Sequence, residues 1–193
     1  GATLFTNVSS ANPYHLIGVP GARAIDANLP IYSSLNPYLQ RFCQTPGTST
    51  MLSEALRANP TFFTLWLGSN DVLSYATSGG LPVTSIFSPS LTDTNTLRLA
   101  LLQVVDEIVN KAKAKGAIAN VPDITSIPYF TTIKYNGVVL SKSKADTLNM
   151  LDTLAHIHWK EGANGFLIVD SSSPGNIRHA TAKDYVLLSI PSD

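Results

Sequence analysis

The feature that most constrains the fold is an alternation of short apolar runs with longer segments of helical periodicity. Strands are predicted for the apolar runs at residues 15–19, 61–67, 117–121 and 166–169. Helices are predicted at residues 48–58, 93–115 and 144–159. Strands that alternate with helices favour a parallel sheet with helices on both faces. The pattern therefore predicts an α/β fold, a three-layer sandwich around a mainly parallel sheet.

Length and composition exclude several classes of protein. The 193 residues fit a single domain spanning residues 1–193, and 44% of them are apolar whereas only 13% are charged. Such a chain is too hydrophobic and too weakly charged to be disordered, and its zero net charge argues against nucleic-acid binding. No apolar run reaches the roughly 18 residues of a transmembrane segment. The single cysteine, Cys43, excludes an internal disulfide and a cysteine-based metal site.

The composition also bears on location, and the first residue bears on completeness. Low charge and abundant serine and threonine favour an extracytoplasmic protein, whether secreted, periplasmic or anchored as a lipoprotein. The chain has no signal peptide and opens at Gly1 rather than at methionine. We therefore expect a processed, engineered or truncated chain.

Two predicted strand ends carry residues suited to chemistry. In parallel sheets, ligands bind beyond the carboxyl ends of the strands. Asn70 follows the run at 61–67, where its amide can donate to a developing negative charge. Gly21 follows the run at 15–19 and can expose a backbone N–H that no side chain obstructs. Each residue is also an ordinary turn former, so the pattern alone leaves both interpretations open.

The two segments together resemble a known family. Gly-Val-Pro-Gly-Ala at residues 18–22 and Leu-Gly-Ser-Asn-Asp at residues 67–71 resemble the second and third sequence blocks of the SGNH/GDSL family of serine ester hydrolases. The third block of that family is Gly-x-Asn-Asp, and the second centres on a glycine that Gly21 matches. Residues 119–130, 161–164 and 177–178 are similar to later parts of a secreted, Bacteroidetes-type branch, so the resemblance covers most of the chain from about His15 onward.

The resemblance implies a fold, an activity and a site. The family sheet is flavodoxin-like, with strand order 2-1-3-4-5, and the reaction is the hydrolysis of carboxylic esters of lipids or acetylated sugars, without a cofactor or a metal. A nucleophilic serine attacks the ester, and an Asp-x-x-His block supplies the base. Gly21 and Asn70 would complete the oxyanion hole with the backbone N–H of that serine. Loss of one such donor typically costs about 3–4 kcal/mol of transition-state stabilisation.

The sequence departs from the family pattern at both ends. It contains neither Gly-Asp-Ser nor Asp-x-x-His, and only Ser9 and Ser10 precede Gly21. The simplest account is a fragment, truncated at both ends, that keeps the oxyanion half and lacks the nucleophile and the base. The main alternative is a non-catalytic α/β binding or scaffold domain that has lost the triad. A third possibility is an unrelated doubly wound domain for a small ligand, although no nucleotide-binding motif is present.

Four histidines are the remaining candidates for a base. Asp152 and His156 are four residues apart, so on a helix they can form either a base with its orienting carboxylate or a plain surface pair. His156 and His158 lack a third metal ligand nearby. His15 lies on a predicted strand and suggests a structural role, and His179 lies in a polar segment where solvent exposure is expected.

Other side chains allow both a functional and a structural interpretation. Cys43 is expected to be a small buried apolar group, because nothing local would activate its thiol. Asp123 and Asp170 follow predicted strands and can line a pocket or cap the next segment. Three aromatic residues can either form a lip for an acyl group or pack in the core, namely Tyr129, Phe130 and Tyr135.

The missing nucleophile block has a structural consequence. In the family order, the strand that carries the serine lies between the strands matched by residues 15–19 and 61–67. Without it, both flanking strands lose a neighbour and keep unpaired backbone groups. We therefore expect one of three outcomes: residues 2–8 fill the gap, another chain supplies a strand, or the two flanking strands pair directly.

Overall fold

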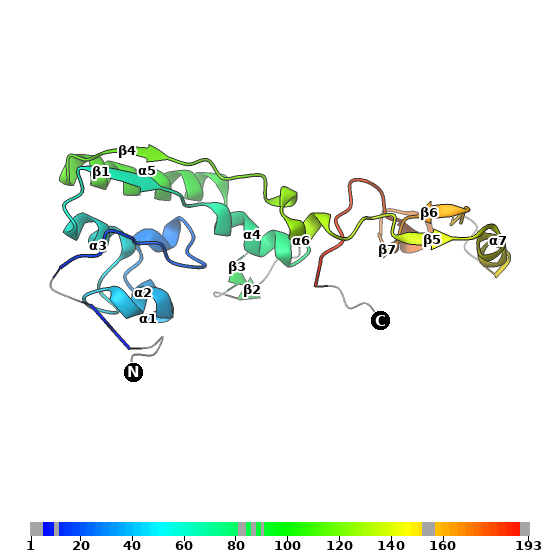
Figure 1. The fold of residues 1–193 in the computed structure, drawn as a ribbon, viewed down its shortest axis with the longest axis horizontal. Coiled ribbons are helices and arrows are strands. Elements are labelled where there is room, and N and C mark those ends of the chain that lie inside the picture. Colours follow the sequence, from blue (N-terminus) through cyan, green and yellow to red (C-terminus); the bar gives the residue numbers. More distant parts are fainter. Residues whose placement is uncertain are drawn as a thin grey trace. The chain divides into compact units, whose positions relative to one another are not determined.

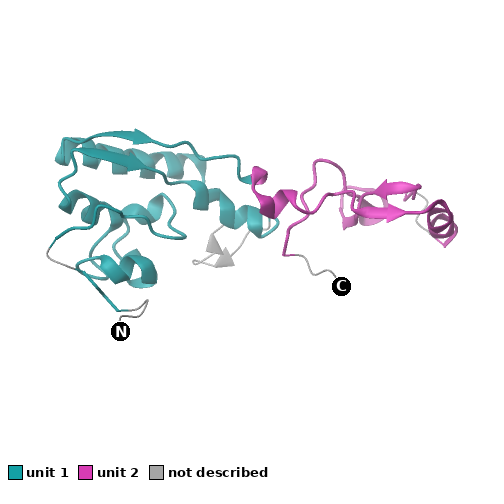
Figure 2. Ribbon diagram, in the orientation of Figure 1, with its two compact units in different colours: residues 1–124 teal, residues 125–193 magenta. Residues whose placement is uncertain are grey.

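The computed structural model describes residues 6–9, 12–80, 84–85, 88–89, 91–151 and 157–189. It divides into two compact units, residues 1–124 and residues 125–193, which Figure 2 shows in different colours. Both units contain helices and strands, so the chain is mixed α/β as predicted.

The first unit is built around one long helix and one parallel pair of strands (Figure 1). Its elements in chain order are η1 (Ile25–Asn28), α1 (Tyr32–Leu35), α2 (Pro37–Phe42), α3 (Met51–Arg57), β1 (Phe62–Leu65), α4 (Ser69–Thr77), β2 (Thr84–Ser85), β3 (Ser88–Pro89), α5 (Thr94–Lys111) and β4 (Lys115–Ile118).

Capping residues explain where the helices begin. Thr50 accepts a hydrogen bond from the Ser53 backbone N–H at 2.9 Å, and Ser53 Oγ accepts one from the Thr50 N–H at 2.8 Å, which is a complete capping box at the start of α3. Asp93 caps α5 by accepting from the Thr96 N–H at 2.9 Å. The helices predicted at 48–58 and 93–115 therefore form, in shorter versions that start at their caps.

The core of this unit lies between α3, α5 and the strand pair. β1 runs parallel to β4, with Phe62 opposite Lys115 and Leu65 opposite Ile118. The central buried cluster comprises Ala27, Leu52, Leu65, Val104, Ile108 and Ala114. The strand predicted at 117–121 begins two residues earlier, at Lys115, because Lys113 adopts a φ of 56° and turns the chain immediately after α5.

The strand predicted at residues 15–19 is wrong. The structure describes these residues as irregular chain, and among the described residues β1 has β4 as its only strand neighbour. A strand requires a pairing partner, and none of the described residues pairs with this segment. The Leu16 side chain is 88% exposed. Direct pairing of the two flanking segments, one of the three expected outcomes, therefore does not occur.

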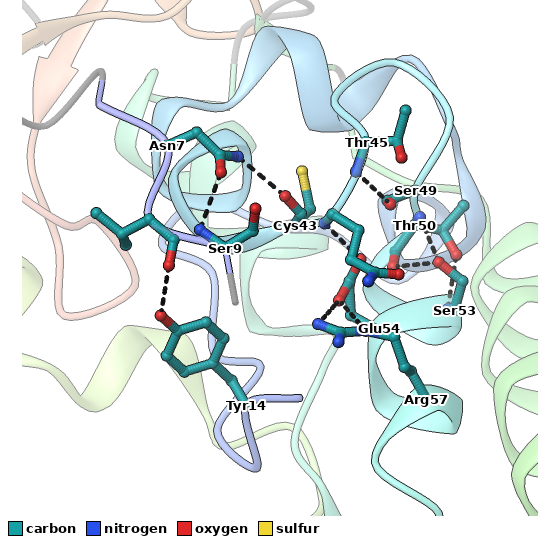
Figure 3. Close-up of polar contacts among 12 residues, drawn as sticks. Asn7, Ser9, Tyr14, Cys43, Thr45, Ser49, Thr50, Ser53, Glu54 and Arg57 are labelled. Atoms are coloured by element: carbon teal, nitrogen blue, oxygen red, sulfur yellow. Dashed lines mark hydrogen bonds and ion pairs between the residues drawn. The ribbon is translucent and has the colours of Figure 1, made fainter. Parts of the chain in front are cut away.

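The described part of residues 2–8 does not fill the gap either. The Val8 N–H donates to the Arg41 carbonyl oxygen at 2.6 Å. The Asn7 amide donates to the Gln40 carbonyl oxygen at 2.7 Å. It also donates to the Cys43 carbonyl oxygen at 2.9 Å (Figure 3). Residues 6–9 are thus attached to the end of α2, and residues 2–5 lie outside the described residues.

The second unit consists of hairpins and short helices. The boundary between the units falls within η2 (Ile124–Ser126). The second unit then contains α6 (Pro128–Thr131), β5 (Val138–Leu140), α7 (Lys142–Leu151), β6 (Gly162–Asn164), β7 (Leu167–Val169), η3 (Pro174–Asn176) and β8 (Ile177–His179). β5 pairs with β6 and β7 pairs with β8, both antiparallel.

Two expectations for the second unit require correction. The run at 166–169 forms β7, but it enters an antiparallel hairpin rather than a parallel sheet, because Gly175 and Asn176 adopt φ values of 65° and 59° and return the chain alongside it. The predicted helix at 144–159 is described only to Leu151, and residues 157–160 are not helical. There the Asn149 amide exchanges two hydrogen bonds with the backbone of Trp159, at 2.8 and 2.9 Å.

Candidate functional site

A sharp turn after β1 places the third-block residues at the start of a helix. Gly68 is the N-cap of α4 with a φ of 110°, a conformation that favours glycine. A Cβ at this position would lie 2.6 Å from the Val121 Cγ2 atom, so the close approach also requires glycine. The turn leaves Asn70 and Asp71 in the first turn of α4.

These two side chains hold the segment that follows Gly21. The Asn70 amide donates to the Ala22 carbonyl oxygen at 2.9 Å, and one Asp71 carboxylate oxygen accepts from the Ala24 N–H at 2.9 Å. The contacts span 48 and 47 residues of sequence. The structure therefore brings Asn70 against the residue next to Gly21, although Gly21 and Asn70 come from separate segments of the chain.

Gly21 itself occupies an exposed turn. The Ala22 N–H donates to the Val19 carbonyl oxygen at 3.2 Å, and Gly21 has a φ of 80°. Proline followed by a glycine of positive φ is the arrangement of a type II turn. No heavy atom lies within 4 Å of the place that a Gly21 Cβ would take. The backbone at Gly21 is thus approachable, while the turn by itself also accounts for the glycine.

The Asn70 amide retains donor capacity. An amide nitrogen carries two N–H groups, and one of them is bonded to the Ala22 carbonyl oxygen. Asn70 is half-buried and lines an apolar cavity of about 470 Å³, where Thr64 is the only other hydroxyl or amide side chain among the described residues. This arrangement can offer a polar donor to a group bound at the end of an apolar cavity.

Asp71 is the feature of the site that sequence reasoning missed. Its side chain is 1% exposed, and its Oδ1 atom has no hydrogen-bond partner among the described residues. A buried acceptor without a donor typically costs about 1–3 kcal/mol, and more when it is charged. The Gly-x-Asn-Asp pattern was the only signal in the sequence, because the burial of Asp71 depends on the distant segment at residues 22–24.

Ser9, one of the two serines that precede Gly21, does not join this site in the described structure. Ser9 lies beside Asn7, whose side-chain oxygen accepts from the Ser9 N–H at 2.9 Å, and the Tyr14 hydroxyl donates to the Val8 carbonyl oxygen at 2.8 Å (Figure 3). Ser10 lies outside the described residues. In the part of the chain that the structure describes, no histidine ring is hydrogen-bonded to a serine hydroxyl.

The histidines are placed differently from one another. His15 is exposed, and His156 lies outside the described residues together with Asp152. The expectation of a solvent-exposed loop for His179 is wrong, because this residue is in β8. Its ring nitrogens lie 2.9 and 3.1 Å from the carbonyl oxygens of Gly165 and His158. Over the described ranges, no group of three or more His, Cys, Asp or Glu side chains is arranged to hold a metal ion.

The prediction for Cys43 is confirmed. Its side chain is fully buried in the cluster that contains Val19, Leu39 and Met51. Burial raises the pKa of the thiol, and the nearby Glu54 carboxylate raises it further. A thiol that resists ionisation in this way is unsuited to nucleophilic catalysis.

In the second unit, Asp170 belongs to a charge cluster that the sequence did not indicate. Arg178 donates through Nε to Asp170, and through Nη1 and Nη2 to both carboxylate oxygens of Asp184, at 2.7 and 2.9 Å. Asp170 also accepts from the Ser172 hydroxyl and N–H, so it caps the turn after β7. Hydrogen bonds from Ser172 and Arg178 hold the pKa of Asp170 far below its usual range, and those from Arg178 do the same for the pKa of Asp184.

The remaining candidates separate into packing and surface groups. Phe130 is buried, with edge-on ring contacts to Tyr129 and Tyr185 at centroid distances of 5.1 and 6.1 Å, so it serves core packing rather than an aromatic lip. Tyr135 lines a second cavity of about 440 Å³ beside His179. Asp123 is exposed.

The comparisons with known proteins add no family assignment. No protein-family model, curated protein or solved structure matches this chain. Among the helices that the structure describes, none has the length and apolar character needed to cross a membrane.

Proposed function

We propose that this chain carries the oxyanion-binding part of a GDSL-type ester hydrolase. The observation that carries the proposal is the hydrogen bond from the Asn70 amide to the Ala22 carbonyl oxygen, beside the exposed backbone of Gly21. Two donors of the kind that stabilise a tetrahedral oxyanion thus lie at neighbouring positions. The parallel pair of β1 and β4 is compatible with the flavodoxin-like sheet of that family.

The proposed chemistry is acyl transfer from a carboxylic ester of a lipid or an acetylated sugar. A serine hydroxyl attacks the ester carbon, and the negative charge that develops on the former carbonyl oxygen receives hydrogen bonds from the Gly21 N–H and the free N–H of Asn70. No metal or cofactor is required. The proposed setting is extracytoplasmic, in keeping with the low content of charged residues.

One observation favours a second candidate, a non-catalytic α/β binding or scaffold domain. In the described residues, the Asn70 amide already has an internal acceptor, and no histidine is bonded to a serine. Under this alternative, Asn70 and Asp71 serve only to hold residues 22–24 against α4.

Ester turnover by the full-length protein distinguishes the two candidates, because the proposal leaves the nucleophile and the base outside the oxyanion-binding part. The substrates are 4-nitrophenyl acetate, 4-nitrophenyl butyrate and a peracetylated sugar, and a fluorophosphonate probe reports an activated serine. We expect Asn70→Ala to lower kcat by about 10²–10³-fold with little change in KM. Asn110→Ala, at an exposed asparagine on α5, is the matched control and should leave turnover unchanged. A folded full-length protein with neither turnover nor labelling would support the non-catalytic candidate instead.

A further inference from the structure

The cavity beside Asn70 has the form of a slot for a missing strand. We use the name "the slot" for this cavity of about 470 Å³ in the first unit. Residues 16–19 form one of its walls and residues 63–67 form the other. Side chains of α3 and α5 also line it, among them Leu52 and Val104.

One wall of the slot is an unpaired strand edge. The carbonyl oxygens of Thr61 and Leu65 accept from the N–H groups of Lys115 and Ala119, at 3.1 and 2.9 Å, so odd-numbered residues of this segment face β4. Backbone groups of alternate residues point to opposite edges of a strand. The N–H and C=O groups of Thr64 and Trp66 therefore face the slot, where the structure describes no neighbouring strand.

The side chains around the slot are mostly apolar, and none of those described is charged. Among the described residues that line it, Thr64 and Asn70 are the only ones with a hydroxyl or amide side chain. Leu16 is 88% exposed and Trp66 is 68% exposed, although each belongs to one of the two walls. Large apolar side chains left open beside an apolar cavity are typical of a surface that another segment covers.

We propose that the slot binds an extended, uncharged, apolar peptide segment as an added β-strand between residues 16–19 and β1. The segment pairs its backbone with Thr64 and Trp66 and places its side chains among those that line the slot. This inference is independent of ester hydrolysis, because the slot and its open edge do not depend on a catalytic serine.

The open backbone edge favours a peptide over a fatty acyl chain, although either would cover the apolar side chains. An acyl chain offers no hydrogen bonds, so it would bury the N–H and C=O groups of the β1 edge without partners. Unsatisfied buried backbone groups are strongly disfavoured, and more than about 90% of them are paired in native structures. A peptide strand satisfies these groups and covers the apolar walls at the same time.

Peptide binding to the intact chain tests the proposal. The probe is an N-acetylated peptide, Val-Thr-Val-Ile-Val-Gly, followed by two lysines for solubility. The control peptide carries proline at its third and fifth positions, which removes two N–H groups and disfavours pairing. We expect the control peptide to bind at least tenfold more weakly. Hydrogen exchange should show new protection of the Thr64 and Trp66 amides when the strand peptide is bound.

Two variants locate the binding in the slot. Thr64→Pro removes a slot-facing N–H, whereas Thr64→Val keeps it and serves as the matched control. Gly18→Leu adds a side chain at a slot-lining position where a Cβ would have no heavy atom within 4 Å, so it tests the site without altering β1. We expect the affinity to fall at least tenfold in Thr64→Pro and in Gly18→Leu, and to stay within twofold in Thr64→Val.

Four results would overturn the proposal. The proline peptide binds as tightly as the strand peptide, or decanoate binds while the strand peptide does not. The Thr64 and Trp66 amides are already protected in the free chain, which means that the slot is filled. The chain self-associates with protection of the same amides, and excess strand peptide does not dissociate it, which identifies a second copy as the occupant. All of these measurements are separate from ester turnover, so they fail or succeed independently of the proposed enzymatic function.

Discussion

Replacing two glycines of one loop by alanine separates backbone strain from side-chain packing at the candidate site. Gly21 has a φ of 80°, whereas Gly18 does not adopt a positive φ, and at both positions the place of a Cβ has no heavy atom within 4 Å. The left-handed conformation costs a residue other than glycine about 1–2 kcal/mol. Alanine at a permissive glycine position stabilises a protein by about 0.4–1 kcal/mol through the unfolded chain. The unfolded-chain term is the same for both variants, so Gly21→Ala should be less stable than Gly18→Ala by the left-handed cost alone, about 1–2 kcal/mol.

Urea unfolding followed by circular dichroism measures this difference. Gly18→Ala is the matched control, because it adds the same methyl group three residues away in the same loop. The Gly21 N–H remains in the alanine variant, so any ester turnover of the wild-type chain should persist at temperatures where the variant is folded. Equal unfolding free energies for the two variants would refute the assigned turn and remove the structural reason for a glycine at position 21.

Three further predictions concern packing and charge. In Gly165→Ala, the new Cβ would meet the Ala180 carbonyl oxygen, a backbone atom that cannot rotate away, so the free energy of unfolding should fall by about 1–3 kcal/mol or more in a urea titration. The pKa values of Asp170 and Asp184 are lowered in the folded chain, so their stabilising contribution is complete above the ordinary aspartate pKa of about 3.9 and is lost as the pH falls below it. Arg178→Gln should weaken this acid-side decrease in stability between about pH 6 and pH 2, whereas Lys183→Gln should not. Asp93→Ala removes the cap of α5 and should cost about 1 kcal/mol, measured against Thr94→Ala, which leaves the cap in place.

Local sequence signals predicted α3 and α5 of the first unit, but not α1, α2 or α4. The apolar periodicity of residues 93–115 and the capping side chain of Asp93 act within a few residues of one another, and α5 begins at the adjacent Thr94. The run that forms β1 is rich in aromatic and β-branched residues, which favour strands wherever they pack. The periodicity, capping and composition that determine these elements lie within their own residues, so the elements can be predicted without knowledge of the rest of the fold.

Pairing between distant segments could not be predicted in the same way. Residues 15–19 have the composition of a strand, but a strand forms only where a second strand offers hydrogen bonds. β7 has a similar composition and pairs with β8 in antiparallel orientation, because Gly175 and Asn176 adopt positive φ values and return the chain alongside β7. The His179 ring became enclosed for the same reason, since β8 carries it to the carbonyl oxygens of Gly165 and His158.

The failed strand prediction and the proposed slot have one physical cause. Residues 16–19 keep apolar side chains along a cavity that α3 and α5 also line. The edge of β1 that faces this cavity has no strand partner among the described residues. The Asn70 and Asp71 contacts fasten residues 22–24 to α4. These contacts fix the end of the loop, whereas its middle has no pairing partner among the described residues. An added strand would form hydrogen bonds with the open edge of β1. The same strand would also cover the exposed side chains of Leu16 and Trp66.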